Sequence, residues 1–158
     1  MRPKQKWLAV IGLVWFAGCI GVLGYALYRS TNEKVLNAYA LDWTATLITE
    51  HLDRNQGEWP KSWEDLATTA ERLQKEAPSE DPEKSATPAS EEISLLRKRV
   101  RVNFNAKPDQ LIKEAADLDT LAEEVVALKS GRASGFQNRD PNVVILEHLR
   151  GKYSRPNR

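Results

Sequence analysis

The chain has few of the side chains on which most enzymes and metal sites depend. Its 158 residues include one cysteine, Cys19, and two histidines, His51 and His148. A single thiol excludes a disulfide framework and a Cys-rich zinc module, and two distant imidazoles have no spacing typical of a metal site. We therefore expect a protein that is not an enzyme, with no catalytic residue, no metal ion and no cofactor.

Common catalytic motifs are missing as well. No Gly-x-Ser-x-Gly sequence marks a nucleophilic serine, and no Lys-Ser or Lys-Thr follows Gly131 or Gly135 to form a phosphate loop. Neighbouring carboxylates such as Glu64 and Asp65 are simply explained as solvated charges. His51 lies on the apolar face of an expected helix, which indicates a packed or rim histidine.

An excess of charge of one sign is also lacking. The 23 Lys and Arg residues balance 22 Asp and Glu residues, for a net charge of +1. Near-neutral charge argues against nucleic acid as a partner. Residues 29–158 hold 27 Leu, Ile, Val and Phe residues in 130, close to the level of roughly 20% below which a chain hardly builds a core.

The N-terminal region, in contrast, contains a long hydrophobic run. Residues 7–28 carry no charge and follow a basic tail, residues 1–6. As a helix the run would measure roughly 33 Å, enough for a hydrocarbon core of about 30 Å. It predicts a single-pass signal-anchor in the lipid bilayer of a bacterial inner (cytoplasmic) membrane. The basic bias places the N-terminus inside and residues 29–158 outside.

Two other interpretations of this run remain open. Phe16-Ala17-Gly18-Cys19 resembles a bacterial lipobox, with Cys19 as lipid acceptor. Gly18, Gly21 and Gly24 form a strip of small residues on which a second copy of the helix could pack. A cleaved signal peptide fits less well, because its apolar region is normally shorter.

The segment 29–74 is expected to be helical. Residues 33–55 repeat apolar side chains at the three-and-four spacing of an amphipathic helix, and Gly57 is a suitable stop. Pro60 then fixes a turn, and Ser62 with Asp65 forms a capping box that opens a second helix through about Leu73.

Trp59 and Trp63 flank this turn. We expect them to pack against Trp43 and Leu47 on the first helix, because the chain has few large apolar groups to spare. The alternative is an exposed aromatic platform for a sugar or a peptide.

Residues 75–92 are predicted to be a disordered linker, because they contain three prolines and no Leu, Ile, Val or aromatic residue. The remainder, 93–152, is predicted to be a small α+β segment, followed by a basic tail at 153–158.

Within 93–152 the periodicity changes to two. In 99–104, Val100 and Val102 alternate with Arg99 and Arg101, which indicates a half-buried strand. Its best partner is 124–129, although 118–128 could instead extend a helix expected at 108–116. A short third strand is possible at 134–137, and Asp140 caps a last helix at 141–150.

The cluster of Arg99 and Arg101 with their basic neighbours has two explanations. It could bind an anion or a lipid headgroup, or it could protect a sheet edge and offset the acidic residues before it. The fold class predicted from all these elements is α+β: a long N-terminal helix, then a two- or three-stranded sheet with short helices.

One sequence pattern resembles a known family. Residues 55–66, Asn-Gln-Gly-Glu-Trp-Pro-Lys-Ser-Trp-Glu-Asp-Leu, at the end of a long amphipathic helix, are similar to the helix-end pattern of pseudopilins and pilin-like bacterial proteins. They also resemble uncharacterised membrane-anchored bacterial proteins of this size. The resemblance implies a long helix packed on a small sheet. It gives structural roles to a set of residues in the turn: Gly57, Trp59, Pro60, Trp63 and Leu66.

The predicted function follows from the anchor and the missing catalytic groups. We expect a membrane-anchored, extracytoplasmic domain with a protein-interaction or structural role. Its expected partners are the lipid bilayer and another envelope protein or a second copy of the chain. The alternative is a membrane-tethered hydrolase or carbohydrate-binding module that uses Trp59 and Trp63.

Overall fold

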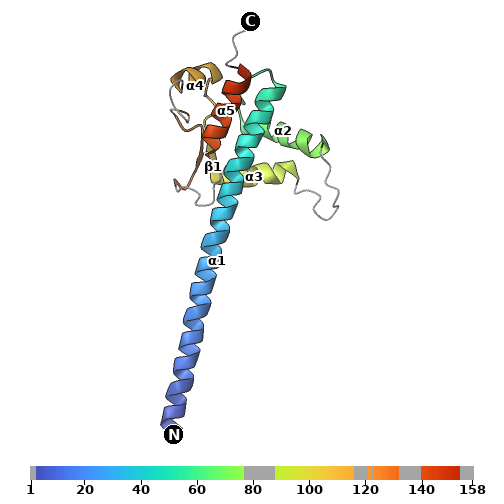
Figure 1. Cartoon of the computed structure of the whole chain (residues 1–158). Coiled ribbons are helices and arrows are strands. Elements are labelled where there is room, and N and C mark those ends of the chain that lie inside the picture. The colour runs from blue at the N-terminus through green and yellow to red at the C-terminus, as the bar shows by residue number, and fades with distance from the viewer. Residues whose placement is uncertain (1–2, 77–87, 116–120, 122, 132–139, 154–158) are drawn as a thin grey trace. The chain divides into compact units, whose positions relative to one another are not determined.

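The computed structural model describes residues 3–76, 88–115, 121, 123–131 and 140–153. The chain divides into two compact units, residues 1–36 and residues 37–158, and each is described by itself. The elements, in order, are α1 (Pro3–Arg54), α2 (Trp63–Glu76), α3 (Ala89–Arg99), β1 (Val100–Val102), α4 (Pro108–Glu114), β2 (Val126–Leu128) and α5 (Pro141–Tyr153) (Figure 1).

Helix α1 contributes to both units. In the first unit, the side chains described from residue 24 to residue 36 are all exposed. In the second unit, α1 is buried along one face, and Asp42 and Asp53 are exposed on the opposite side. Its buried residues there are Ala40, Leu41, Thr44, Ala45, Leu47, Ile48 and Leu52. The expected amphipathic face is therefore confirmed at Ala40, Leu47, Ile48 and Leu52, whereas Leu36 and Tyr39 are exposed.

The predicted membrane span is corrected by the structure. A span needs about 20 consecutive apolar residues, and no helix in the part of the chain with described side chains is long and apolar enough. In that part, the apolar stretch of α1 ends at Tyr28, and Arg29 forms an exposed ion pair with Glu33 at 3.5 Å. This finding contradicts the predicted transmembrane helix, signal-anchor and single-pass inner-membrane location. The side chain of Cys19 lies outside the described residues.

Helix α3 is an element that the sequence prediction missed. Its first turn, Ala89–Glu92, falls in the segment predicted to be a linker, and residues 77–87 lie outside the described ones. Acidic Glu91 and Glu92 begin the helix and basic Arg97–Arg99 end it, an arrangement that suits the helix dipole. The Tyr39 hydroxyl of α1 donates to Glu92 at 2.6 Å. Burial, together with this bond, raises the pKa of Tyr39 to about 12.

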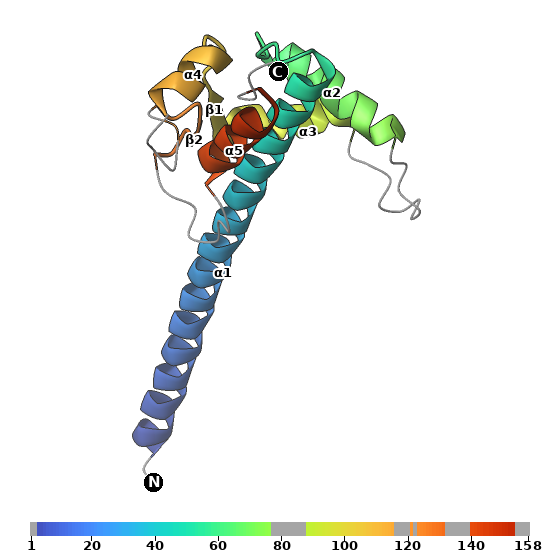
Figure 2. The ribbon, with the colours of Figure 1, turned by 45° about the horizontal axis from the view of Figure 1, so that its top comes forward.

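The sheet described here has two antiparallel strands, β1 and β2, which Figure 2 shows side by side. Val100 pairs with Leu128, Arg101 with Ala127, and Val102 with Val126. The valines of β1 are buried and Arg101 is exposed, as the alternation predicts. Both predicted strands are therefore confirmed, each shorter than expected. The possible third strand, 134–137, lies outside the described residues.

The last two helices close the second unit by packing against each other. Helix α4 starts at Pro108 as expected and ends at Glu114. Before α5, the Asp140 carboxylate accepts the backbone N–H of Asn142 at 2.8 Å, which confirms Asp140 as the N-cap. Helix α5 does not stop at Gly151 but continues to Tyr153.

The described residues form a mostly helical α+β fold with one hydrophobic core in the second unit. Leu47, Ile48 and Leu52 of α1 pack there with residues from the other helices and both strands. The largest fully buried side chains from those elements are Leu66, Leu96, Val100, Val126, Ile145, Leu146 and Leu149. The core thus ties together segments that are about 100 residues apart in the sequence.

Candidate functional site

The turn after α1 requires two consecutive residues with positive φ. Gln56 has φ 55° and Gly57 has φ 88°. The Gly57 N–H donates to the Leu52 carbonyl at 2.8 Å, and the Glu58 N–H donates to Asn55 at 3.0 Å. These bonds satisfy carbonyls left over at the helix end, and glycine adopts this conformation without a Cβ clash. Gly57 therefore has the structural role that the sequence indicated.

The aromatic residues beyond the turn are anchors. Trp59 is 7% exposed, and its indole N–H donates to the Asn103 carbonyl at 2.9 Å, which ties the turn to the end of β1. Pro60 is buried beside it. Trp63 is half-buried and packs edge-on against Phe104, with ring centroids 5.7 Å apart. A sugar platform needs exposed ring faces, so the burial of Trp59 gives the alternative function no support.

The start of α2 shows a variant of the expected capping box. The Ser62 hydroxyl oxygen accepts the Glu64 N–H at 3.2 Å, as an N-cap should. The Asp65 carboxylate reaches back to the Lys61 N–H at 2.7 Å, one residue before the cap. Leu66, which follows directly, is fully buried. The turn thus positions Leu66 in the core.

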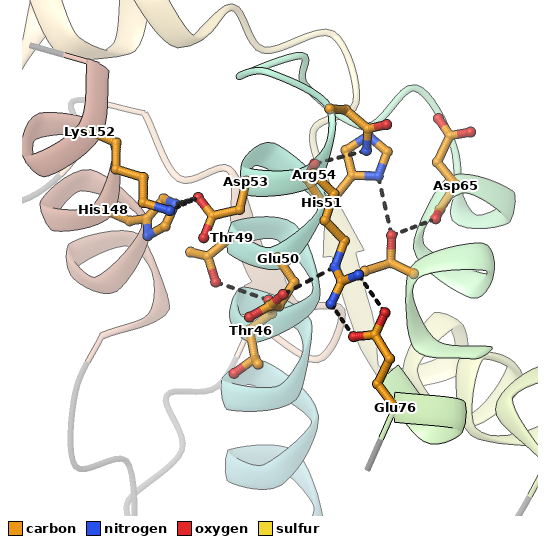
Figure 3. A network of polar contacts seen from close by, with 12 residues as sticks. Thr46, Thr49, Glu50, His51, Asp53, Arg54, Asp65, Glu76, His148 and Lys152 are labelled. Carbon is orange, nitrogen blue, oxygen red and sulfur yellow. Dashed lines mark hydrogen bonds and ion pairs between the residues drawn. The ribbon is translucent and has the colours of Figure 1, made fainter. Parts of the chain in front are cut away.

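A network of polar side chains surrounds the C-terminal end of α1 (Figure 3). The Asp53 carboxylate of α1 accepts from His148 Nε2 at 2.7 Å and lies 2.6 Å from Lys152 Nζ, both on α5. Burial works against ionisation of Asp53, but the bonds from Lys152 and His148 outweigh it and hold its pKa below the ordinary value. This cluster fixes α5 to the end of α1.

On the other side of α1, the network reaches α2. Arg54 forms a two-pronged ion pair with Glu76, at 2.8 and 2.5 Å, and a longer contact with Glu50 at 3.4 Å. The bond from Arg54 lowers the pKa of the Glu76 carboxyl. Helix α2 is therefore held to α1 near its own C-terminal end.

His51 is the second link to α2. Its Nδ1 lies 3.3 Å from the Thr69 hydroxyl oxygen. The single hydrogen of that hydroxyl is directed to the Asp65 carbonyl at 3.0 Å, so we assign the remaining hydrogen bond to donation from His51 Nδ1–H. Burial lowers the pKa of His51, although Asp65 and Glu58 partly oppose this effect. His51 is thus the rim histidine that the sequence indicated, and its partly buried position disfavours the protonated form.

Sequence reasoning missed two asparagines that organise the sheet. The Asn142 side chain, 3% exposed, accepts from the backbone N–H groups of Val125 and Val126 and donates to the Val126 carbonyl. It occupies the outer edge of β2 as a neighbouring strand would. The backbone carbonyl of Asn103 accepts the Trp59 indole N–H, and the side-chain amide of Asn103 donates to the Glu123 carboxylate at 3.2 Å. The sequence held one signal for this role: Asn142 is a polar residue in the otherwise apolar first turn of α5, and a buried polar side chain needs hydrogen-bond partners.

The structure places Arg99 and Arg101 in different elements: Arg99 is the last residue of α3, not the first of a strand as predicted, and Arg101 lies in β1. The Arg99 guanidinium donates to the Asn37 side-chain oxygen at 2.7 Å, and Arg101 is exposed. Neither lies in the polar network around Asp53 and Arg54. The predicted site residues therefore fall into two groups, the turn from Gly57 to Leu66 and the two arginines at the junction of α3 and β1.

Among the residues that the structure describes, no three His, Cys, Asp or Glu side chains gather as metal ligands. Comparison of the chain with protein-family models, curated proteins and solved structures gives no match. The resemblance of residues 55–66 to pilin-like proteins therefore stays a prediction, and the function must be argued from the molecule's own surfaces.

Proposed function

We propose that this chain is a non-catalytic protein-interaction module that associates with a second copy of itself through the exposed part of α1 in residues 24–36. The observation that carries the proposal is a stripe of apolar side chains left in solvent. Tyr25 is 66% exposed, Tyr28 70%, Val35 49% and Leu36 39%. Exposed apolar stripes of this kind typically mark protein-binding surfaces.

The spacing of the stripe suits pairing with another helix. Tyr25, Tyr28, Asn32 and Val35 follow one another at steps of three, four and three residues, the seam of a heptad repeat. Leu36 lies beside them within about 100° of the helix circumference. A polar Asn32 inside an apolar seam favours one register and two strands, at some cost in stability. The pattern therefore favours a helix of the same sequence as partner.

The helix in this region also needs a partner for its own stability. Isolated helices gain little free energy from hydrogen bonding alone and are stabilised mainly by packing of an apolar face. Here all described side chains from residue 24 to residue 36 are exposed, and a Cβ atom added at Gly21 or Gly24 would meet nothing within 4 Å. A second helix packed on the stripe would supply the missing contacts.

Sedimentation equilibrium of the full chain tests the proposal. We expect a concentration-dependent dimer, and Val35→Glu or Tyr28→Glu should raise its dissociation constant about tenfold or more, because a charge would be buried in the seam. Leu27→Glu is the matched control: Leu27 is 66% exposed but lies off the stripe, so this variant should dimerise like the wild type. A wild-type monomer at high concentration, or equal effects of Leu27→Glu and Val35→Glu, would overturn the proposal.

A further inference from the structure

The exposed stripe of α1 has two kinds of seam position. Tyr25 and Asn32 occupy the first kind, and Tyr28 and Val35 occupy the second. When two copies of such a helix pair in parallel and in register, each seam residue faces its own copy. When they pair antiparallel, a residue of the first kind faces a residue of the second kind. The direction of pairing therefore decides what Asn32 meets.

Asn32 carries the single amide of the seam. Its side chain is exposed, and among the described residues it has no hydrogen-bond partner. An amide has both donors and an acceptor, so Asn32 facing its own copy forms a hydrogen bond across the seam. Facing Tyr28 or Val35 of an antiparallel copy, the amide would lose its bonds to water and meet a ring or methyl groups instead. A parallel pair satisfies Asn32, and an antiparallel pair does not.

The charge beside the seam favours the same direction. Arg29 directly follows Tyr28 and forms an exposed ion pair with Glu33 of its own helix at 3.5 Å. In the antiparallel pair that places Tyr28 opposite Asn32, the two copies of Arg29 flank the same layer and repel each other. In a parallel pair, the flanking position that faces Arg29 is that of Gly24, where an added Cβ would meet nothing within 4 Å. The guanidinium group then has space and no like charge beside it.

We propose that the two copies pair in parallel and in register, so that the Asn32 amide of one chain donates to the Asn32 side-chain oxygen of the other. This inference rests on the proposed self-association and adds its direction. Because residues 37–158 follow the stripe in the chain, a parallel pair carries both copies of them at the same end of the paired segment. An antiparallel pair would carry them at opposite ends.

Oxidative crosslinking of the full chain tests the direction. Tyr28→Cys and Val35→Cys are made separately, each together with Cys19→Ser so that only the new thiol reacts. A disulfide requires two Cα atoms roughly 4.4–6.8 Å apart. In the parallel pair each new cysteine faces its own copy, so both variants should form disulfide-linked dimers. In any antiparallel register, at least one of the two positions lies about 10 Å or more from its copy along the helix axis and stays reduced.

Ser30→Cys, again with Cys19→Ser, is the matched control. Ser30 is exposed and lies two residues from both Tyr28 and Asn32, which places it on the opposite side of the helix. We expect only the slow crosslinking of random collisions from this variant. Each variant is oxidised above the dissociation constant that sedimentation equilibrium gives for it, so that a weaker dimer is not mistaken for a different direction.

Substitution of Asn32 tests the polar layer itself. Asn32→Val should lower the dissociation constant of the dimer about tenfold and also allow species larger than a dimer, because a polar residue at this position specifies two strands at a cost in stability. Ser30→Val, on the opposite side of the helix, should leave the dissociation constant within about twofold. Sedimentation equilibrium measures both effects.

The outcomes separate this inference from the self-association on which it rests. If the wild type sediments as a dimer but only one or neither of Tyr28→Cys and Val35→Cys crosslinks, the parallel direction is wrong and self-association stands. Equal crosslinking rates for Ser30→Cys and the two seam variants would also contradict it. An unchanged dissociation constant for Asn32→Val would place Asn32 outside the interface. A wild type that stays monomeric at high concentration would overturn both proposals.

Discussion

The two parts of helix α1 differ in their surroundings far more than in their composition. Between residues 24 and 36 it carries Tyr25, Tyr28 and Val35 in solvent, whereas between Ala40 and Leu52 it carries residues that are almost completely buried. Both parts combine apolar and polar residues within one continuous helix. The difference shows that burial along a helix is set by the elements packed on it, and that an uncovered apolar stripe is a surface to be explained.

We expect the largest effect on the free energy of unfolding when a leucine in the buried part of α1 is compared with a valine in the exposed part. Leu52 is 0% exposed, and Leu52→Ala should lower the free energy of unfolding by about 2–5 kcal/mol through lost burial and a cavity. Val35→Ala should change it by less than about 0.5 kcal/mol at concentrations where the chain is monomeric. Urea denaturation followed by circular dichroism measures both. Similar losses would show that residues 24–36 are packed inside the monomer after all.

The second comparison uses asparagines. Asn142→Ala removes three hydrogen bonds to the backbone of Val125 and Val126 and leaves buried groups without partners, so we expect a loss of about 2–4 kcal/mol. Asn32→Ala, the same substitution in the exposed part of α1, should be neutral or slightly stabilising, because alanine is the better helix former. The same urea titration applies. A small effect at Asn142 would mean that water replaces its bonds.

A third comparison separates the two tryptophans of the turn. Trp59→Phe removes the indole donor from the Asn103 carbonyl and reduces buried volume, for an expected loss of about 2 kcal/mol. Trp63→Phe keeps a ring against Phe104 and should cost about 0.5–1 kcal/mol. Thermal unfolding of the two variants ranks them. The reverse order would indicate that Trp63, not Trp59, anchors the turn.

The smallest effect depends on pH. Burial lowers the pKa of His51 from its ordinary value of 6.5. At a pH between the pKa values of the folded and unfolded states, the unfolded chain therefore binds a proton at His51 and the folded chain does not. The stability linked to His51 is therefore fully present above about pH 6.5 and is lost as the pH falls through the lower pKa of the folded state.

Urea denaturation between about pH 7.5 and about pH 5 tests this expectation. The wild type should lose more stability over this range than His51→Gln, whose amide still donates to Thr69. The lowered pKa values of Asp53 and Glu76 place their contributions at more acidic pH, below their ordinary values of 3.8 and 4.5. Parallel pH curves for both proteins would show that His51 titrates normally.

Local patterns predicted much of the second unit. The alternation around Val100 and Val102, the Pro-containing start of α5 and the helix stop at Gly57 each depend on neighbours in sequence, and the structure shows all three. Helix α3 was missed because the apolar content of its first turn is low. Its acidic beginning and basic end, Glu91 to Arg99, were the signal that could have revealed it.

The long-range polar contacts could not be predicted from the sequence, for a different reason. Asp53 meets His148 across 95 residues, and Asn142 reaches the edge of β2 across 16. No spacing rule connects such pairs, because their proximity exists only once the helices have packed. The basic residues Arg99 and Arg101 were noticed in the sequence. That Lys129 lies opposite Arg99 could not be predicted, because this position depends on strand register.

By itself, the amino-acid sequence determined the helices and strands other than α3, and it determined the turn at Gly57 and Pro60, because capping, periodicity and backbone preference act over a few residues. Tertiary structure alone decided that the Trp59 indole donates to the Asn103 carbonyl, that α1 changes from exposed to buried near Ala40, and that Lys129 lies beside Arg99. Burial and register depend on what a segment meets in space, and distant parts of one chain supply those neighbours.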